Sequence, residues 1–190
     1  MWGKNIAGFM KVQVSMMQKT AGSLMLIGGA EDKTGNCVIL KKFVELAGET
    51  YSRIVVITTA SCNPAESGEQ YGDLFRRLGA GEIEILNVND RQSAARDINV
   101  SLIERATGIF FTGGDQLRIT GVLGGTPLWK AIQEGCLKGH VVAGTSAGAS
   151  VISGAMIVEG GEDNLARKCT VKMAPGLGLF EEIIIDQHFT

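Results

Sequence analysis

The sequence has little proline, histidine or cysteine. Its 190 residues include three prolines, two histidines and four cysteines, and no two cysteines have CxxC spacing. Because paired Cys and His ligands are missing, we expect no bound metal. We also expect no cofactor. We interpret the cysteines as reduced thiols of a cytoplasmic protein; they stand at positions 37, 62, 136 and 169.

An excess of charge of one sign is also missing. The chain has 18 Lys and Arg residues against 20 Asp and Glu residues, a net charge of −2. Because there is no basic stripe, we expect no nucleic-acid partner. Because no run of ~18 residues is apolar, we expect no membrane span. Lys11 and Gln13 interrupt the apolar stretch near the start, which is unlike a signal peptide.

Glycine and apolar residues are plentiful. The 26 glycines are about 14% of the chain, near twice the usual ~7%, but they follow no Gly-X-Y period, which excludes a collagen-like fold. With 45% hydrophobic and 20% charged residues, we expect a globular protein. Residues 1–22 lack a sustained period, so we expect an N-terminal extension at 1–22 and a single domain at 23–190.

Short apolar runs recur from Ser23 onward. Several are apolar at nearly every position, which is typical of strands covered on both faces. The predicted strands are Leu24–Ile27, Ile54–Thr58, Ile83–Val88, Ile109–Thr112, Val141–Ala143, Met156–Val158 and Ile183–Ile185.

Helical patterns separate these runs. The spacing predicts helices over 37–48, 68–80, 99–106 and 128–137. The first should turn Val38, Phe43, Val44 and Leu46 inward and end at Gly48. Strands that alternate with helices predict an α/β fold with a mainly parallel sheet. Glycine clusters follow the first, fourth and fifth strands, at the carboxyl edge where such sheets bind ligands.

The motif Gly144-Thr145-Ser146-Ala147-Gly148 follows an apolar strand and leads into small residues. This is the context of a nucleophile elbow, in which Ser146 would be exposed at the start of a helix. The N–H of Ala147 would then point toward a developing oxyanion. A G-x-S-x-G sequence also arises by chance in a glycine-rich chain, so a purely structural strand–helix junction is the alternative.

A nucleophilic serine needs a base, and the chain has only two histidines, His140 and His188. His140 begins the strand that ends at Ser146, so it should lie at the far end of the sheet. His188 follows a predicted strand and should lie at the carboxyl edge. We therefore favour His188, with a histidine that merely caps a strand as the alternative.

Three other stretches contain residues that could take part in chemistry. In FFTGGDQ (110–116), the Gly-Gly pair offers a second backbone donor, Asp115 is equally suited to cap the next helix, and Gln116 offers a donor and an acceptor. IGGAED (27–32) lacks G-x-G-x-x-G and is interpreted as a plain strand-to-helix turn. Cys136 falls within a helix, where we expect a buried small residue rather than a nucleophile.

Several stretches in this order resemble the cyanophycinase family of serine peptidases, which is related to peptidase E. They are LIGGAEDK (26–33), RIVVITTAS (53–61), ATGIFFTGGDQLRIT (106–120), LGGTPL (123–128), VAGTSAGAS (142–150), PGLGL (175–179) and IDQHF (185–189). The resemblance implies a three-layer α/β sandwich like that of class I glutamine amidotransferases. It also implies hydrolysis of cyanophycin, a poly-aspartate with arginine on its β-carboxyls, to β-Asp-Arg dipeptides.

The resemblance also implies roles for single residues. Ser146 would be the nucleophile and His188 its base. The N–H groups of Gly114 and Ala147 would form the oxyanion hole. The substrate pocket would be lined by Gln116, Asp186 and Gln187, and the protein would be a homodimer.

The family's triad acid, a glutamate, and its substrate-binding arginines lie downstream of the stretch that resembles IDQHF. The 190 residues end at Thr190, so we expect the C-terminal elements of the domain to be missing from them. Two alternatives stay open: an aspartyl dipeptidase of peptidase E type, and an inactive truncated remnant.

Overall fold

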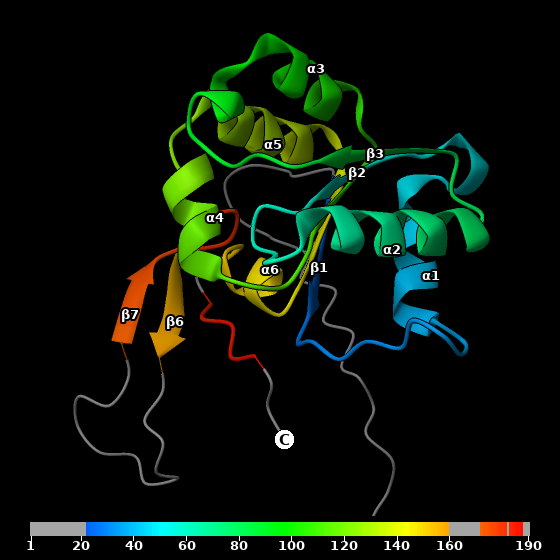
Figure 1. Ribbon diagram of the computed structural model, residues 1–190, viewed down its shortest axis with the longest axis horizontal. Coiled ribbons are helices and arrows are strands. Elements are labelled where there is room, and N and C mark those ends of the chain that lie inside the picture. The colour runs from blue at the N-terminus through cyan, green and yellow to red at the C-terminus, as the bar shows by residue number, and fades with distance from the viewer. Residues whose placement is uncertain (1–21, 160–171, 182, 188–190) are drawn as a thin grey trace, which may run out of the picture.

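The computed structural model describes residues 22–159, 172–181 and 183–187. The expected extension at 1–22 therefore lies outside the described residues except for Gly22. Helices and strands alternate along the described chain, with two short 3₁₀ helices (Figure 1). The strands are β1 (Ser23–Ile27), β2 (Arg53–Ile57), β3 (Glu82–Leu86), β4 (Gly108–Phe111), β5 (Val141–Thr145), β6 (Ala155–Glu159) and β7 (Lys172–Pro175). The helices are α1 (Val38–Ala47), α2 (Pro64–Arg77), α3 (Asp97–Arg105), α4 (Gln116–Leu123), α5 (Pro127–Lys138) and α6 (Ala147–Ser150), and the 3₁₀ helices are η1 (Glu49–Tyr51) and η2 (Ser93–Ala95).

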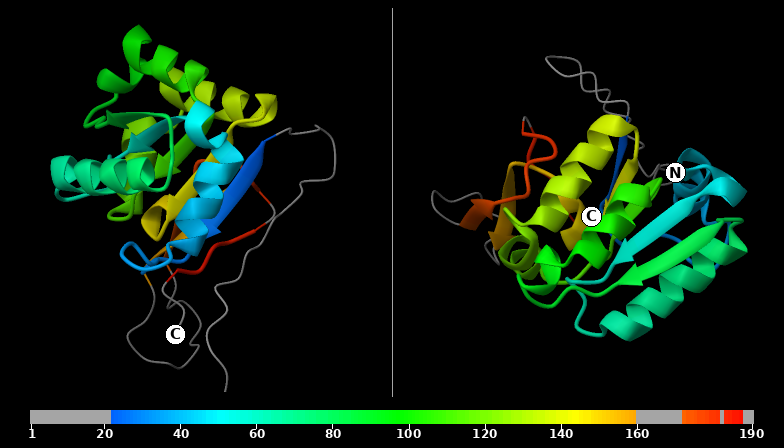
Figure 2. Two further views of the ribbon diagram at one scale, coloured as in Figure 1. Left: turned by 90° about the vertical axis from the view of Figure 1, so that its right-hand side faces the viewer. Right: turned by 90° about the horizontal axis from the view of Figure 1, so that it is seen from above.

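Five parallel strands form the central sheet in the order β1-β5-β4-β2-β3. Successive residues of a strand point to opposite faces. Ile54 and Val56 accordingly join the core under α1 and α2, whereas Val55 and Ile57 join the core under α3, α4 and α5. Helices therefore cover both faces of the sheet, as the views in Figures 1 and 2 show. The predicted three-layer α/β fold is confirmed.

Local signals explain where the helices begin and end. The Asp115 carboxylate accepts hydrogen bonds from the N–H groups of Leu117 and Arg118 and caps α4. Pro64 and Pro127 occupy the first turns of α2 and α5. Gly48 takes the left-handed conformation that ends α1, as predicted.

The structure corrects three expectations about individual elements. In α1, Val38 is 61% exposed and Leu46 is 39% exposed, while Leu40 and Ala47 are buried with Phe43 and Val44. The helix is therefore turned about its own axis relative to the expectation, so that Leu40 and Ala47 complete the buried face. Helix α2 begins at Pro64, four residues before the predicted start.

The third correction concerns the last predicted strand. The predicted strand Met156–Val158 is present as β6, which pairs antiparallel with β7 in a ribbon outside the parallel sheet (Figure 1). The predicted strand Ile183–Ile185 is wrong, because residues 183–187 have no strand conformation. That segment passes the carboxyl edge of the sheet near α6 rather than along an edge strand, so it finds no ladder partner. The Ser150 hydroxyl donates instead to the Ile185 carbonyl, at 3.4 Å.

The described part of the chain holds no helix with the length and apolar character needed to cross a membrane.

Candidate active site

The candidate site lies where three neighbouring parallel strands end. Strands β1, β5 and β4 are adjacent, and their carboxyl ends lead into Gly28-Gly29, Ser146 and Gly113-Gly114. Such an edge is the usual ligand-binding position in a parallel α/β sheet. The Ser146 N–H donates to the Ile27 carbonyl at 2.9 Å, which ties the turn after β5 to the end of β1.

Ser146 has backbone angles of φ 52 and ψ −119. A positive φ is costly for a residue with a Cβ and persists only where the surrounding structure enforces it. The residue stands between the last residue of β5 and the first residue of α6, so its side chain projects from a sharp strand–helix turn. This is the geometry of a nucleophile elbow.

Glycine is required on both sides of this turn by close backbone approach. A Cβ at Gly144 would lie 2.1 Å from the Gly148 carbonyl oxygen, and a Cβ at Gly148 would lie 2.5 Å from the Phe111 carbonyl oxygen. Any side chain at either position would force the backbone apart. The spacing of the two glycines in the motif therefore has a steric cause.

The Ser146 hydroxyl donates a hydrogen bond to Gln187 Oε1 at 2.9 Å. The segment 183–187 thus reaches back over the elbow, and the residue after Gln187 is the predicted base, His188. His188 lies outside the described residues. Asp186 is exposed, whereas Gln187 is half-buried against the elbow.

The turn after β4, which contains Gly113 and Gly114, and the start of α6 both adjoin Ser146. A Cβ at Gly113 would be 3.3 Å from Ser146 Cβ, so the turn after β4 passes directly beside the serine. Gly114 has φ +139 and is packed against the Ala60 carbonyl. Ala147 is the first residue of α6 and is buried. The backbone hydrogen bonds of the described turns and caps include none donated by the N–H of Gly114 or Ala147.

The side chain of Gln116 is hydrogen-bonded to the β6–β7 ribbon. Its Nε2 donates to the Ile157 carbonyl at 3.2 Å, which links α4 to strand β6. The structure thus brings Gln187 to the serine and engages the Gln116 amide with the β6–β7 ribbon. Of the two roles expected for Asp115, helix cap or site residue, the structure shows the cap of α4.

His140 precedes β5, and Ser146 follows it, so the two residues lie at opposite ends of the strand. Burial and the nearby Lys138 lower the pKa of His140 below its usual value. Cys136 is buried in α5, as predicted, and burial raises the pKa of its thiol. Neither residue is placed to act on Ser146.

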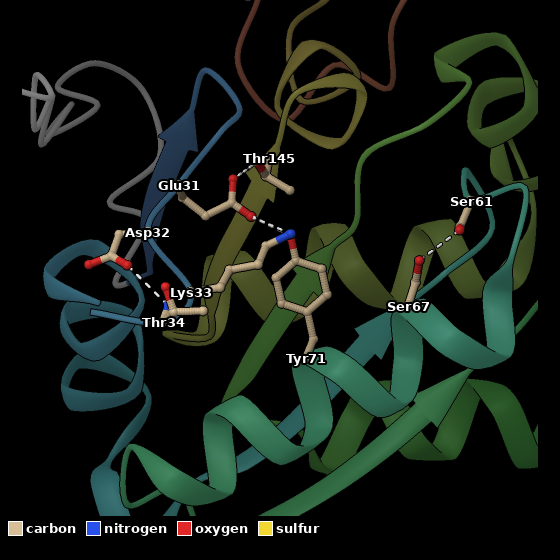
Figure 3. A network of polar contacts seen from close by, with 8 residues as sticks. All are labelled: Glu31, Asp32, Lys33, Thr34, Ser61, Ser67, Tyr71 and Thr145. Atoms are coloured by element: carbon tan, nitrogen blue, oxygen red, sulfur yellow. Dashed lines mark hydrogen bonds and ion pairs between the residues drawn. The ribbon is translucent and has the colours of Figure 1, made fainter. Parts of the chain in front are cut away.

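A hollow of ≈ 240 Å³ lies beside Ser146. Its lining includes Thr145 and Ser146 from the elbow, Gly113 from the turn after β4, and polar residues from the β1–α1 loop and from α2. Tyr71 Oη donates to Glu31 Oε1, and Thr145 Oγ1 donates to Glu31 Oε2 at 2.5 Å (Figure 3). The Glu31 carboxylate therefore joins α2 to the residue that directly precedes the serine.

The carboxylate at the centre of this network stays ionised. Burial raises the pKa of Glu31, but hydrogen bonds from Thr145 and Tyr71 outweigh burial, and the net pKa lies below its usual value. Burial and the adjacent Glu31 carboxylate raise the pKa of Tyr71 far above its usual value. Lys33 Nζ lies 3.4 Å from Glu31 Oε1 and 4.6 Å from the centre of the Tyr71 ring.

The sequence does not predict this wall of the site, because residues 27–32 are expected to form a plain strand-to-helix turn. The turn has positive φ at Gly29 and also at Ala30, a residue with a Cβ. That backbone directs Glu31 into the site. The available signal was positional: an acidic residue follows Gly28-Gly29 at the same sheet edge as Ser146.

Comparison with known proteins decides the family. The model of peptidase family S51 matches residues 24–190. This chain belongs to peptidase family S51. A cyanophycinase of Nostoc sp. PCC 7120 is 41% identical over 173 residues, which cover 90% of this chain and 58% of that protein. A cyanophycinase of Geminocystis herdmanii is 41% identical over 175 residues, which cover 92% of this chain and 64% of that protein.

A solved structure has the same fold. The crystal structure of a peptidase from an acI-B1 actinobacterium superposes with a TM-score of 0.69 at 31% identity, and the match covers 88% of this chain and 68% of that one. This chain spans 58% of the length of the Nostoc protein and 64% of the length of the Geminocystis protein.

Proposed function

We propose that this S51 family member is a serine-type exopeptidase that hydrolyses cyanophycin to β-Asp-Arg dipeptides. The substrate class is supported by 41% identity to proteins named cyanophycinase. The serine mechanism is supported by one observation above all, the strained conformation of Ser146 at the end of β5. We further propose that the protein acts as a cytoplasmic homodimer without a cofactor.

In the proposed reaction, Ser146 Oγ attacks the carbonyl carbon of the scissile bond and passes its proton to His188. The carbon–nitrogen bond then breaks as His188 returns the proton to the leaving amine. Water hydrolyses the resulting ester and restores the serine. His188 is assigned as base because it directly follows Gln187, whose side chain accepts the Ser146 hydrogen bond.

The N–H groups of Gly114 and Ala147 are proposed to bind the oxyanion. Backbone donors that are already in position stabilise the negative charge of the tetrahedral intermediate without reorganisation. Gln187 and Asp186 are proposed to contact the substrate from the 183–187 segment. For Gln116 the same role requires its amide to exchange the Ile157 carbonyl for the substrate.

The test measures release of β-Asp-Arg from cyanophycin together with fluorophosphonate labelling. Ser146→Ala should abolish labelling and lower turnover by about 10³-fold or more. Ser101→Ala, a matched serine change in α3 away from the hollow, should leave both unchanged. Full turnover by Ser146→Ala would contradict the proposal.

The same assay separates the two alternatives. Faster cleavage of an α-Asp dipeptide than of the β-linked substrate would favour an activity of peptidase E type. A folded chain that neither turns over substrate nor labels at Ser146 would favour the inactive remnant.

A further inference from the structure

The hollow beside Ser146 contains two charged side chains that the proposed mechanism does not use. Among the described residues that line it, Lys33 is the one cation and Glu31 is the one anion. Both come from the β1–α1 loop, and both lie against Tyr71 of α2 (Figure 3). Their contacts decide which of the two charges is available to a ligand.

The Glu31 carboxylate is hydrogen-bonded within the protein. The Glu31 side chain is 2% exposed, and each carboxylate oxygen accepts a hydroxyl hydrogen bond, one from Tyr71 and one from Thr145. A carboxylate with both oxygens occupied and almost no contact with solvent is poorly placed to bind a cationic group. The guanidinium groups of an arginine-bearing substrate therefore have no free partner in Glu31.

The Lys33 ammonium is held near Glu31 and Tyr71, but its ion pair with Glu31 is long. The ammonium lies 3.4 Å from Glu31 Oε1, which is longer than the 2.7–2.9 Å of a strong charge-assisted hydrogen bond. The Tyr71 ring supports it at 4.6 Å. An ammonium has three donors, and the Lys33 side chain is 31% exposed. It therefore keeps donors for a ligand while its position is restrained by two neighbours.

We propose that Lys33 binds a carboxylate of the substrate in this hollow, next to the carbonyl that Ser146 attacks. The inference rests on the proposed function, in which the substrate carries free carboxylates on its arginine branches and at its main-chain end. The hollow, at ≈ 240 Å³, is smaller than the ~300–1,000 Å³ of sites for drug-sized ligands. It therefore suits one such acidic group rather than a long segment of polymer.

The experiment measures binding without turnover. In the Ser146→Ala chain, calorimetry gives the Kd of the β-Asp-Arg dipeptide and of its two mono-amides, each lacking one carboxylate. We expect Lys33→Met to weaken binding of the free acid by about ten-fold or more, and Lys33→Arg to retain most of the affinity. Amidation of the bound carboxylate should cost as much as Lys33→Met, and the two changes together should cost no more than either alone. The mono-amide that shows this pattern identifies the carboxylate.

Lys42→Met is the matched control, because Lys42 is an exposed lysine of α1 that pairs with Glu45 outside the hollow. It should leave every Kd unchanged, and thermal unfolding should show that all variants fold. An unchanged Kd in Lys33→Met, an equal Lys33→Met penalty with both mono-amides, or no binding to the chain that retains Lys33 would overturn the inference. Because no step depends on turnover, this failure is distinguishable from failure of Ser146 as the nucleophile.

Discussion

Thr145 connects the elbow to the network on the opposite wall of the hollow. It is the last residue of β5 and is buried, and its hydroxyl donates to the equally buried Glu31 carboxylate at 2.5 Å. The next residue, Ser146, has the positive φ that defines the elbow. The hydrogen bond therefore joins a strained backbone to an anchored carboxylate. Its loss should lower the free energy of unfolding.

Thr145→Val removes the hydroxyl and keeps the shape of the side chain. We expect the free energy of unfolding to fall by about 1.5–3 kcal/mol, because a buried hydrogen bond to a charged group is lost. Thr145→Ser keeps the donor and should lose clearly less. Urea denaturation of the two variants measures the difference, and equal losses would show that the hydroxyl contributes nothing.

At the scale of elements, the site depends on how closely β4, β5 and α6 approach one another. Gly148 lies in the first turn of α6 against the carbonyl oxygens of Phe111 and Thr112, at the end of β4. A larger residue would move α6 away from β4. The Ala147 N–H and the turn that holds Ser146 would move with it.

Gly148→Ala should therefore destabilise the protein by about 1–3 kcal/mol, as overpacking does in a close-packed core, and slow fluorophosphonate labelling of Ser146. Gly121→Ala is the control in α4, where an added Cβ meets nothing within 4 Å. There alanine should stabilise by about 0.5–1 kcal/mol, because it reduces the conformational freedom of the unfolded helix segment. Denaturation and labelling rates check both, and a Gly148→Ala chain as stable as Gly121→Ala would refute the steric argument.

At the scale of the molecule, two hydrophobic cores flank one sheet. Phe110 of β4 lies in the core under α1 and α2, with its ring 5.5 Å from Phe43, 5.2 Å from Phe75 and 4.8 Å from Tyr71 between centres. Its neighbour Phe111 points into the other core. The aromatic cluster thus holds α1 and α2 on the sheet and supports Tyr71, which orients Glu31.

Phe110→Ala should lower the free energy of unfolding by about 3–5 kcal/mol, because it removes a buried ring and leaves a cavity. Tyr51→Ala, at a residue that is 90% exposed, should change stability by less than ~0.5 kcal/mol. Chemical denaturation of both variants gives the comparison. A loss below ~1 kcal/mol for Phe110→Ala would mean that the cluster does not hold the two helices.

Much of the fold was predictable because the responsible signals are local. Strands β1 to β5 occur within two residues of their predicted bounds because nearly continuous apolar runs suit strands buried on both faces. The elbow was predictable because two glycines and a serine stand at fixed spacing after such a strand. The inner face of α1 was predicted less well, since a small residue such as Ala47 is buried without adding much to an apolar pattern.

The sequence by itself determined the alternation of strands and helices, the position of the serine turn and the carboxyl edge on which a site should form. Only the tertiary structure decided that 183–187 crosses the elbow instead of forming a strand, and that Glu31, Lys33 and Tyr71 form a wall beside Ser146. The physical reason is distance along the chain. Glu31 and Thr145 are 114 residues apart, so no local pattern records their contact, which exists because parallel pairing places β1 beside β5.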